Sequence, residues 1–141
     1  MNSIQFFVED LSFELKQKKK IRSWLNTIAS KYEAEIEQLN YIYCSDNYLL
    51  EVNKTYLNHD YYTDIITFDQ SDGEGPIEAD IFISIDRVKD NASTSSSSWM
   101  SELHRVMVHG LLHLLGFDDK TDEQKQIMRK TENDCLSLLP S

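Results

Sequence analysis

The most informative stretch of this chain is His109-Gly110-Leu111-Leu112-His113-Leu114-Leu115-Gly116-Phe117-Asp118-Asp119. Two histidines four residues apart on a helix lie one turn apart on the same face, so both imidazoles can reach one ion. Gly116 readily adopts the left-handed conformation that ends a helix, and the turn after it can bring Asp119 back towards the histidines. Two nitrogens and a carboxylate oxygen suit zinc with one open coordination position. The spacing therefore predicts a catalytic metal site with His109, His113 and Asp119 as ligands.

The residues around the two histidines indicate a helix at the centre of the fold. They are apolar nearly all round: Val106, Met107, Leu111, Leu112, Leu114 and Leu115. Two imidazoles without partners would be costly in a core, which favours metal ligands over packing residues. Asp118 is a candidate to orient a ligand imidazole through its free N–H, and it is also an alternative to Asp119 as the third ligand.

The residue after the first histidine argues against one class of zinc enzyme. Zinc peptidases with the sequence H-E-x-x-H carry a glutamate there, and this glutamate acts as the general base. Here the position is Gly110, so peptide hydrolysis by that mechanism lacks its proton acceptor. The pattern resembles a zincin without its proteolytic base.

Bulk properties predict one ordered domain spanning residues 1–141. The chain is 40% hydrophobic and contains two prolines, and no apolar run approaches the length of a membrane span. The N-terminus lacks the features of a signal peptide. Cys44 and Cys135 do not have CxxC spacing, which is typical of reduced cysteines in a cytoplasmic protein.

The net charge of −10 argues against broad, non-specific affinity for nucleic acid, which depends on Lys and Arg. One basic cluster stands out: Lys16, Lys18, Lys19, Lys20 and Arg22. Such a run is either a solvated helix face or a surface that contacts phosphates.

Hydrophobic periodicity predicts strands at residues 4–8, 36–44, 64–68 and 79–85. Helices are expected at 12–30, at 45–56, at 86–92, from the serines of 93–98 through His113, and from Thr121 onwards, where Thr121 begins a capping box. The last helix should bury Ile127, Met128, Cys135 and Leu138. A turn is expected at Asp72-Gly73-Glu74-Gly75-Pro76 and a loop at 57–62. The fold class is therefore α+β, with a sheet of about four strands packed by helices.

The segment His109–Asp118 resembles the motif of the YbeY family of bacterial metal-dependent endoribonucleases. Two further segments resemble the same family: Thr63-Asp64-Ile65-Ile66-Thr67-Phe68 its T-D-V-L-S-F segment, and Ala79-Asp80-Ile81-Phe82-Ile83 its G-D-I-x-I strand. The resemblance covers nearly the whole chain. It implies a zincin-like α+β fold, one zinc ion, and cleavage of single-stranded RNA in ribosomal RNA 3′-end maturation and ribosome quality control. It also implies ribosomal RNA and the small ribosomal subunit, or a ribosome-associated protein, as partners.

The chain departs from the family pattern at two positions. The family's third ligand is a histidine where this chain has Asp119, a mild change because a carboxylate binds zinc at about the same distance. The family also has an arginine where this chain has Leu57, which removes a cation that could stabilise a pentavalent phosphate. His59 is the candidate to replace this arginine, as a proton donor or as a hydrogen-bond donor to phosphate. Its alternative is a simple exposed loop histidine.

Three functions are consistent with the sequence. The first is a zinc endoribonuclease acting on ribosomal RNA precursors. The others are a zinc metallohydrolase with another substrate, and a non-catalytic ribosome-associated module in which zinc is structural. Metal content and RNA cleavage with and without a chelator distinguish the three.

Overall fold

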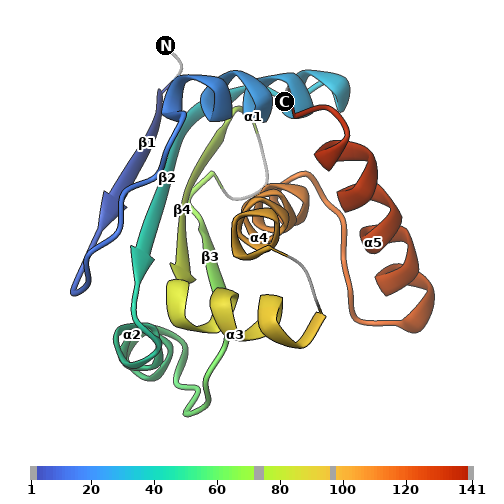
Figure 1. Ribbon diagram of the computed structural model, residues 1–141. Coiled ribbons are helices and arrows are strands. Elements are labelled where there is room, and N and C mark those ends of the chain that lie inside the picture. Colours follow the sequence, from blue (N-terminus) through green and yellow to red (C-terminus); the bar gives the residue numbers. More distant parts are fainter. Residues whose placement is uncertain (1–2, 72–74, 96–97, 140–141) are drawn as a thin grey trace.

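The computed structural model describes residues 3–71, 75–95 and 98–139. The elements follow one another along the chain as β1 (Ser3–Val8), α1 (Lys18–Lys31), β2 (Ile36–Cys44), α2 (Asp46–Leu57), β3 (Ile65–Asp69), β4 (Ile77–Ser84), α3 (Ile85–Ser95), α4 (Trp99–Leu114) and α5 (Asp122–Leu136) (Figure 1). Five helices and four strands over these residues confirm the α+β class.

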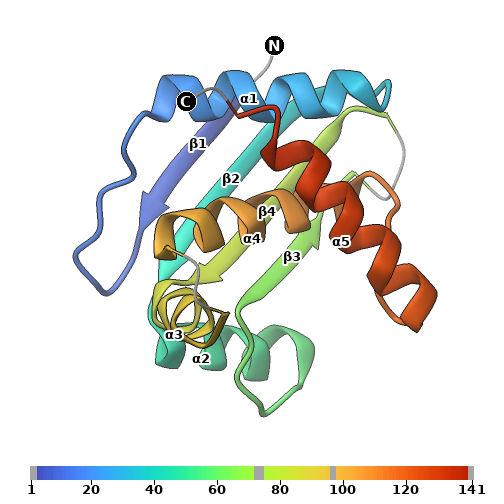
Figure 2. The ribbon, with the colours of Figure 1, turned by 45° about the vertical axis from the view of Figure 1, so that its right-hand side comes forward.

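The four strands form one mixed sheet with the order β1-β2-β4-β3. β2 pairs in parallel with both β1 and β4, while β3 runs antiparallel to β4 at the edge of the sheet. Figures 1 and 2 show α1 and α4 against one face of the sheet, with α5 lying outside α4. α4 thus lies between the sheet and α5 and also contacts α1 and α3. It is the central helix of the fold, as the sequence predicts.

The core lies between the sheet and α4, and two tyrosines of β2 anchor it. Tyr41 and Tyr43 are fully buried, and the Tyr41 hydroxyl donates to the carbonyl oxygen of Met107 at 2.9 Å. On the far side of α4, the indole N–H of Trp24 in α1 donates to the carbonyl oxygen of Cys135 at 2.8 Å and ties α1 to α5. These bonds satisfy the polar atoms of large buried rings, so the burial of the rings stabilises the fold without a desolvation penalty.

α4 lies unusually close to the sheet at Gly110. A Cβ atom at this position would lie 2.9 Å from Cδ1 of Ile65 in β3 and 3.0 Å from Cδ1 of Ile81 in β4. These separations are shorter than a carbon–carbon contact allows, since optimal contacts are about 3.5–4.0 Å. The absence of a side chain at Gly110 therefore lets α4 lie directly on β3 and β4.

Two of the predicted elements need correction. α1 begins at Lys18 rather than residue 12, because the preceding segment is held against the core by the buried side chain of Leu15 and then turns through Gln17 at φ 59°. Lys16 therefore lies outside the helix. Two residues expected on the buried face of the last helix are exposed: Ile127 of α5, at 49%, and Leu138, which follows the end of α5, at 39%.

Met128 and Cys135 are buried as predicted, and Thr131 and Glu132 are buried with them on the same helix. α5 can bury the carboxylate of Glu132 because Arg105 and His109 of α4 form hydrogen bonds with it. The capping box at Thr121 is present as predicted, with reciprocal bonds between Thr121 and Gln124.

The connections around α3 and α4 match the prediction in part. α3 extends to Ser95, and the Ser98 hydroxyl caps α4 by accepting from the Ser101 N–H at 3.1 Å. Of the expected turn at 72–76, residues 72–74 lie outside the described part of the chain, and so do Ser96 and Ser97 of the serine run. Within the described part, no helix has the length and apolar character needed to cross a membrane.

Candidate metal centre

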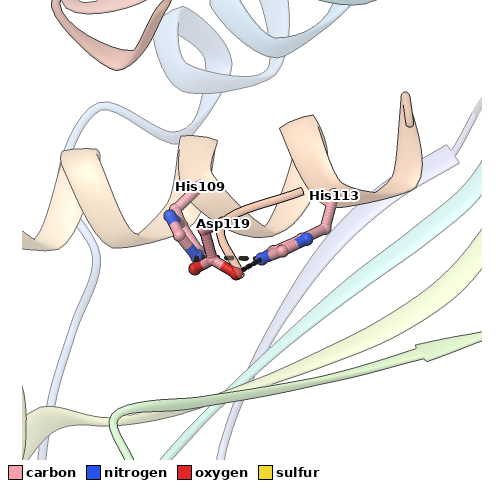
Figure 3. A group of neighbouring side chains, drawn as sticks. All are labelled: His109, His113 and Asp119. Carbon is pink, nitrogen blue, oxygen red and sulfur yellow. Dashed lines mark hydrogen bonds and ion pairs between the residues drawn. The ribbon is translucent and has the colours of Figure 1, made fainter. Parts of the chain in front are cut away.

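α4 brings His109 and His113 together, and the loop after it adds Asp119 (Figure 3). The two Nε2 atoms of the histidines lie 3.1 Å apart. Asp119 places Oδ2 at 3.3 Å from Nε2 of His109 and Oδ1 at 3.6 Å from Nε2 of His113. All three side chains are partly exposed, so the cluster is open to solvent. The structure therefore brings together the three residues that the sequence predicts as ligands.

The turn at the end of α4 explains how Asp119 returns to the histidines. Gly116 has a φ of 104°, and its N–H donates to the carbonyl of His113 while the Phe117 N–H donates to that of Leu112. These two bonds form a Schellman motif, which satisfies the last carbonyls of the helix and reverses the chain. Phe117 then packs edge-on against Tyr32 at 5.4 Å and holds the reversed segment in place.

The cluster fits a divalent metal ion. Nitrogen and oxygen ligands bind zinc at about 2.0–2.2 Å, so adjacent corners of a tetrahedron lie about 3.3–3.6 Å apart. The two Nε2 atoms are 3.1 Å apart, and a different oxygen of Asp119 faces each of them, at 3.3 and 3.6 Å; one ligand atom from each residue falls within 4.8 Å of the others. The donor set is two imidazoles and a carboxylate, with solvent access for a fourth ligand. These three residues would hold the ion.

A buried carboxylate on α5 orients the first histidine. Nδ1 of His109 donates to Oε2 of Glu132 at 2.7 Å, while Oε1 of Glu132 accepts from Arg105 at 2.9 Å. Arg105 in turn donates to the side chain of Asn133 at 2.7 Å. Only 7% of the Glu132 side chain is exposed. A carboxylate facing Nδ1 favours the neutral tautomer with its proton on Nδ1, and this tautomer directs the lone pair of Nε2 at the cluster, as in most metal-binding histidines.

The charges of this network shift two pKa values in opposite directions. Burial opposes the charge on His109, but its hydrogen bond to Glu132 and the carboxylates of Glu132, Asp119 and Asp64 together raise the pKa of His109 above 6.5. Burial likewise opposes the charge on Glu132, but the hydrogen bonds from His109 and Arg105 lower its pKa below 4.5. Glu132 is therefore an anion at neutral pH and a hydrogen-bond acceptor for Nδ1.

A small cavity adjoins His109, and Asp64 forms part of its wall. The cavity has a volume of about 160 Å³ and is lined by Asp64, Glu102, Arg105, Val106, His109, Arg129 and Glu132. This is smaller than the roughly 300–1,000 Å³ of small-molecule pockets. Burial raises the pKa of Asp64, while His109 and Arg87 oppose that shift. Asp64 thus adds a carboxyl group beside the ligand histidine from the start of β3.

The structure does not bring the two predicted catalytic residues into this cluster. Asp118 is exposed and has no hydrogen bond or ion pair with any described residue, and Glu132 holds the orienting position on His109. His59 lies in the loop between α2 and β3, where Nδ1 is 3.0 Å from the hydroxyl of Tyr61. Leu57, at the position of the family arginine, ends α2 with 40% of its surface exposed.

Sequence reasoning missed Glu132 and Arg105. A signal for Glu132 was present, because it falls four residues after Met128 and three before Cys135, on the same face of α5. An acidic residue on an apolar helix face implies a buried partner, since an unpaired buried charge is costly. The identity of the partner on α4 depends on the tertiary fold and has no local signal.

Comparison with known proteins identifies the family and the fold of this chain. Residues 3–140 match the family described as endoribonuclease YbeY. The endoribonuclease YbeY of Cytophaga hutchinsonii is 59% identical over 136 residues, which cover 96% of this chain and 95% of that protein. The endoribonuclease YbeY of Parabacteroides distasonis is 44% identical over 138 residues, covering 98% and 96%. A solution structure of a Thermotoga maritima protein shares the fold, with a TM-score of 0.68, 24% identity, and coverage of 96% of this chain and 88% of that one. A match over nearly the whole length, together with these relatives, establishes that the chain belongs to the YbeY family of endoribonucleases.

Proposed function

We propose that the protein is a zinc-dependent endoribonuclease that cleaves single-stranded RNA in ribosomal RNA 3′-end maturation and ribosome quality control. Hydrolysis of phosphodiester bonds follows from membership in the family. The observation that carries the metal dependence is the convergence of His109, His113 and Asp119 within 4.8 Å of one another. Two imidazoles and one carboxylate favour zinc over magnesium, which prefers an octahedral shell of oxygens.

When bound, zinc would polarise a phosphate oxygen and lower the pKa of a bound water. The protein supplies orientation and the movement of protons. Glu132 fixes the imidazole of His109 through Nδ1, and Arg105 fixes Glu132. Because Gly110 provides no base, another group must accept the proton of the water. The carboxyl of Asp64 lies beside His109, and its raised pKa suits a general base. Proton donation by His59 and orientation by Asp118 stay predictions.

The decisive experiment measures metal content and RNA cleavage on the same purified protein. We expect about one zinc per chain, cleavage of a single-stranded RNA that stops with chelator, and recovery when zinc is returned. His109→Ala is the control that should neither bind metal nor cleave. Cleavage that continues after all metal is removed would contradict the proposal. Bound zinc without cleavage of any RNA would instead favour the non-catalytic ribosome-associated module.

We further propose that the partners are ribosomal RNA and the small ribosomal subunit, or a ribosome-associated protein, in the cytoplasm. Within the basic cluster, two of the five side chains already have partners in the protein. Arg22 donates to the carbonyl of Ile4 at 2.7 Å and lies over the ring of Phe6, and Lys16 pairs with Glu14 at 3.1 Å. Lys18 and Lys19 remain exposed in the first turn of α1.

The double variant Lys18→Glu, Lys19→Glu tests this surface. Glutamates in the first turn favour the helix dipole, so weaker binding could not be ascribed to loss of α1. We expect weaker association with small ribosomal subunits, a salt slope reduced by roughly 0.7 per lost contact with single-stranded RNA, and unchanged metal content. Binding equal to that of the parent would identify the cluster as a solvated helix face.

A further inference from the structure

The end of α2 and the loop that follows it expose an unusual amount of aromatic surface. The exposed fractions are 71% for Tyr56, 55% for Tyr61 and 52% for Tyr62, and His59 is exposed as well. Single exposed rings are common on protein surfaces, but several within seven residues form a patch, and patches mark binding sites.

Two of these rings form an ordered pair. The rings of His59 and Tyr61 stack with centroids 5.1 Å apart and an angle of 20° between their planes. The Tyr61 hydroxyl lies 3.0 Å from Nδ1 of His59, which fixes the two rings relative to each other. Tyr62 is held separately, since the guanidinium of Arg87 lies 5.7 Å from its ring centre and its hydroxyl donates to Asn47 at 3.3 Å.

A buried amide fixes the backbone beneath this pair. Asn53 of α2 is 1% exposed, and its side-chain nitrogen donates to the carbonyl of Tyr61 at 2.9 Å. The backbone carbonyl of Asn53 accepts from the backbone N–H of His59 at 3.1 Å. The rings are therefore presented on an ordered loop, so a ligand that stacks on them need not pay to order the chain.

The loop leads directly to the metal centre. Tyr61 is three residues before Asp64, which lines the cavity beside His109. Three residues of extended chain span at most about 11 Å. Figure 2 shows the loop running from α2 into the start of β3, the edge strand nearest α4. A base stacked on Tyr61 would therefore lie within a few nucleotides of the reacting phosphate.

We propose that His59 and Tyr61 form a base-stacking subsite for single-stranded RNA; this inference rests on the proposed function. In a protein with a net charge of −10, contacts with phosphates are disfavoured in general, whereas every base offers a π face. Asp60, which lies between His59 and Tyr61 in the sequence, adds negative charge to this loop. This charge disfavours a phosphate site there but does not prevent stacking. Stacking on an aromatic platform tolerates any sequence, so the subsite would bind unpaired bases without selecting among them.

The test compares RNA binding by the parent protein and by Tyr61→Ala, in chelator to prevent cleavage. The probe is a labelled oligoadenylate of about ten nucleotides, within the roughly 4–16 nucleotides of known single-strand sites. Loss of one stacked base corresponds to a roughly five- to 150-fold weaker affinity. Tyr61→Phe should retain the affinity, because it keeps the ring. Tyr56→Ala, which removes an even more exposed tyrosine that packs on Phe68, is the matched control and should bind like the parent.

Two readouts separate stacking from other contacts. Tyr61→Ala should weaken binding without changing the salt slope, and it should leave binding of an abasic oligonucleotide of the same length unchanged. In zinc-loaded protein, Tyr61→Ala should raise KM at constant kcat, because a stacked base contributes to binding and not to the chemistry. A fall in kcat at constant KM in Tyr61→Ala would overturn the stacking subsite.

The outcomes distinguish this inference from the function on which it rests. Parent protein that cleaves RNA with zinc, together with Tyr61→Ala binding equal to that of the parent, overturns the stacking subsite alone. Equal losses in Tyr61→Ala and Tyr56→Ala also overturn it, because the effect would then not be specific to the ordered pair. A zinc-loaded parent that neither binds nor cleaves RNA overturns both.

Discussion

The contact between α4 and α5 and the loop between α2 and β3 both lead to the candidate metal centre, yet they are built in opposite ways. In the first, charged groups are buried and bonded to one another, from Arg105 through Glu132 to His109. In the second, rings are exposed and only the backbone is fixed, by Asn53. Buried networks lose stability when one member is removed, whereas exposed rings contribute little to it. We therefore expect changes in the first region to affect folding and metal together, and changes in the loop to affect RNA alone.

Glu132→Ala should give the largest effect. It leaves Arg105 and His109 without their partner in a buried setting, which typically costs about 3–5 kcal/mol. Affinity for the metal should also fall, by the roughly 10–100-fold usual for a lost partner of a ligand histidine. Denaturant unfolding of the metal-free protein and zinc titration measure the two effects. Asp134→Ala, an exposed carboxylate two residues away on α5, is the control. Stability equal to that of the control would show that the network does not support the fold.

Removal of the metal should destabilise the parent but not His109→Ala. An ion that binds only the folded state adds about 2.7 kcal/mol when its concentration is a hundred times the dissociation constant. Thermal melts with and without chelator reveal this difference. Tyr61→Ala should respond to chelator as the parent does, because the loop has no part in metal binding. If the chelator left the melting temperature of the parent unchanged, metal binding would not be coupled to folding. That result would contradict the expectation that the α4–α5 contact supports both.

Asn53→Asp should have an intermediate effect and separate the two regions further. It keeps the shape of the side chain but removes the donor to the Tyr61 carbonyl and buries a charge in its place. The loss of a buried hydrogen bond costs roughly 1–3 kcal/mol. RNA affinity should fall with it, while zinc content stays at the level of the parent. Loss of zinc in this variant would couple the loop to the metal centre and contradict the independence of the two regions.

The smallest effect is on the pH dependence of stability in metal-free protein. His109 has a raised pKa, so its contribution is complete below 6.5 and is lost as the pH rises through its folded-state pKa. Glu132 has a lowered pKa, so its contribution is complete above 4.5 and is lost as the pH falls through its folded-state pKa. The difference in unfolding free energy between the parent and Glu132→Gln should therefore be largest between about pH 4.5 and 6.5. A difference in unfolding free energy that grows steadily towards alkaline pH would contradict a stabilising interaction between protonated His109 and the Glu132 carboxylate.

The comparison also explains which features the sequence could predict. The spacing of His109 and His113 and the capping box of Thr121 are local, because they depend on residues that are neighbours along the chain. Glu132 reaches His109 across 23 residues, and only the packing of α5 on α4 brings them together. The exposure of Ile127 has the same cause, since that packing decides which side of α5 faces inward. Sequence spacing therefore predicts that His109 and His113 share one face of a helix, whereas only the tertiary structure identifies Glu132 as the residue that orients His109.

The close contact at Gly110 has a consequence for how this fold can change. A glutamate in place of Gly110, as in a zinc peptidase, would put its Cβ 2.9 Å from Cδ1 of Ile65 and 3.0 Å from Cδ1 of Ile81, so something at this contact would have to move. If α4 moved, it would carry His109 and His113 away from Asp119, which lies on the loop after the helix. A route from this nuclease scaffold to peptide hydrolysis would therefore begin with smaller side chains at Ile65 and Ile81, before the glutamate is introduced.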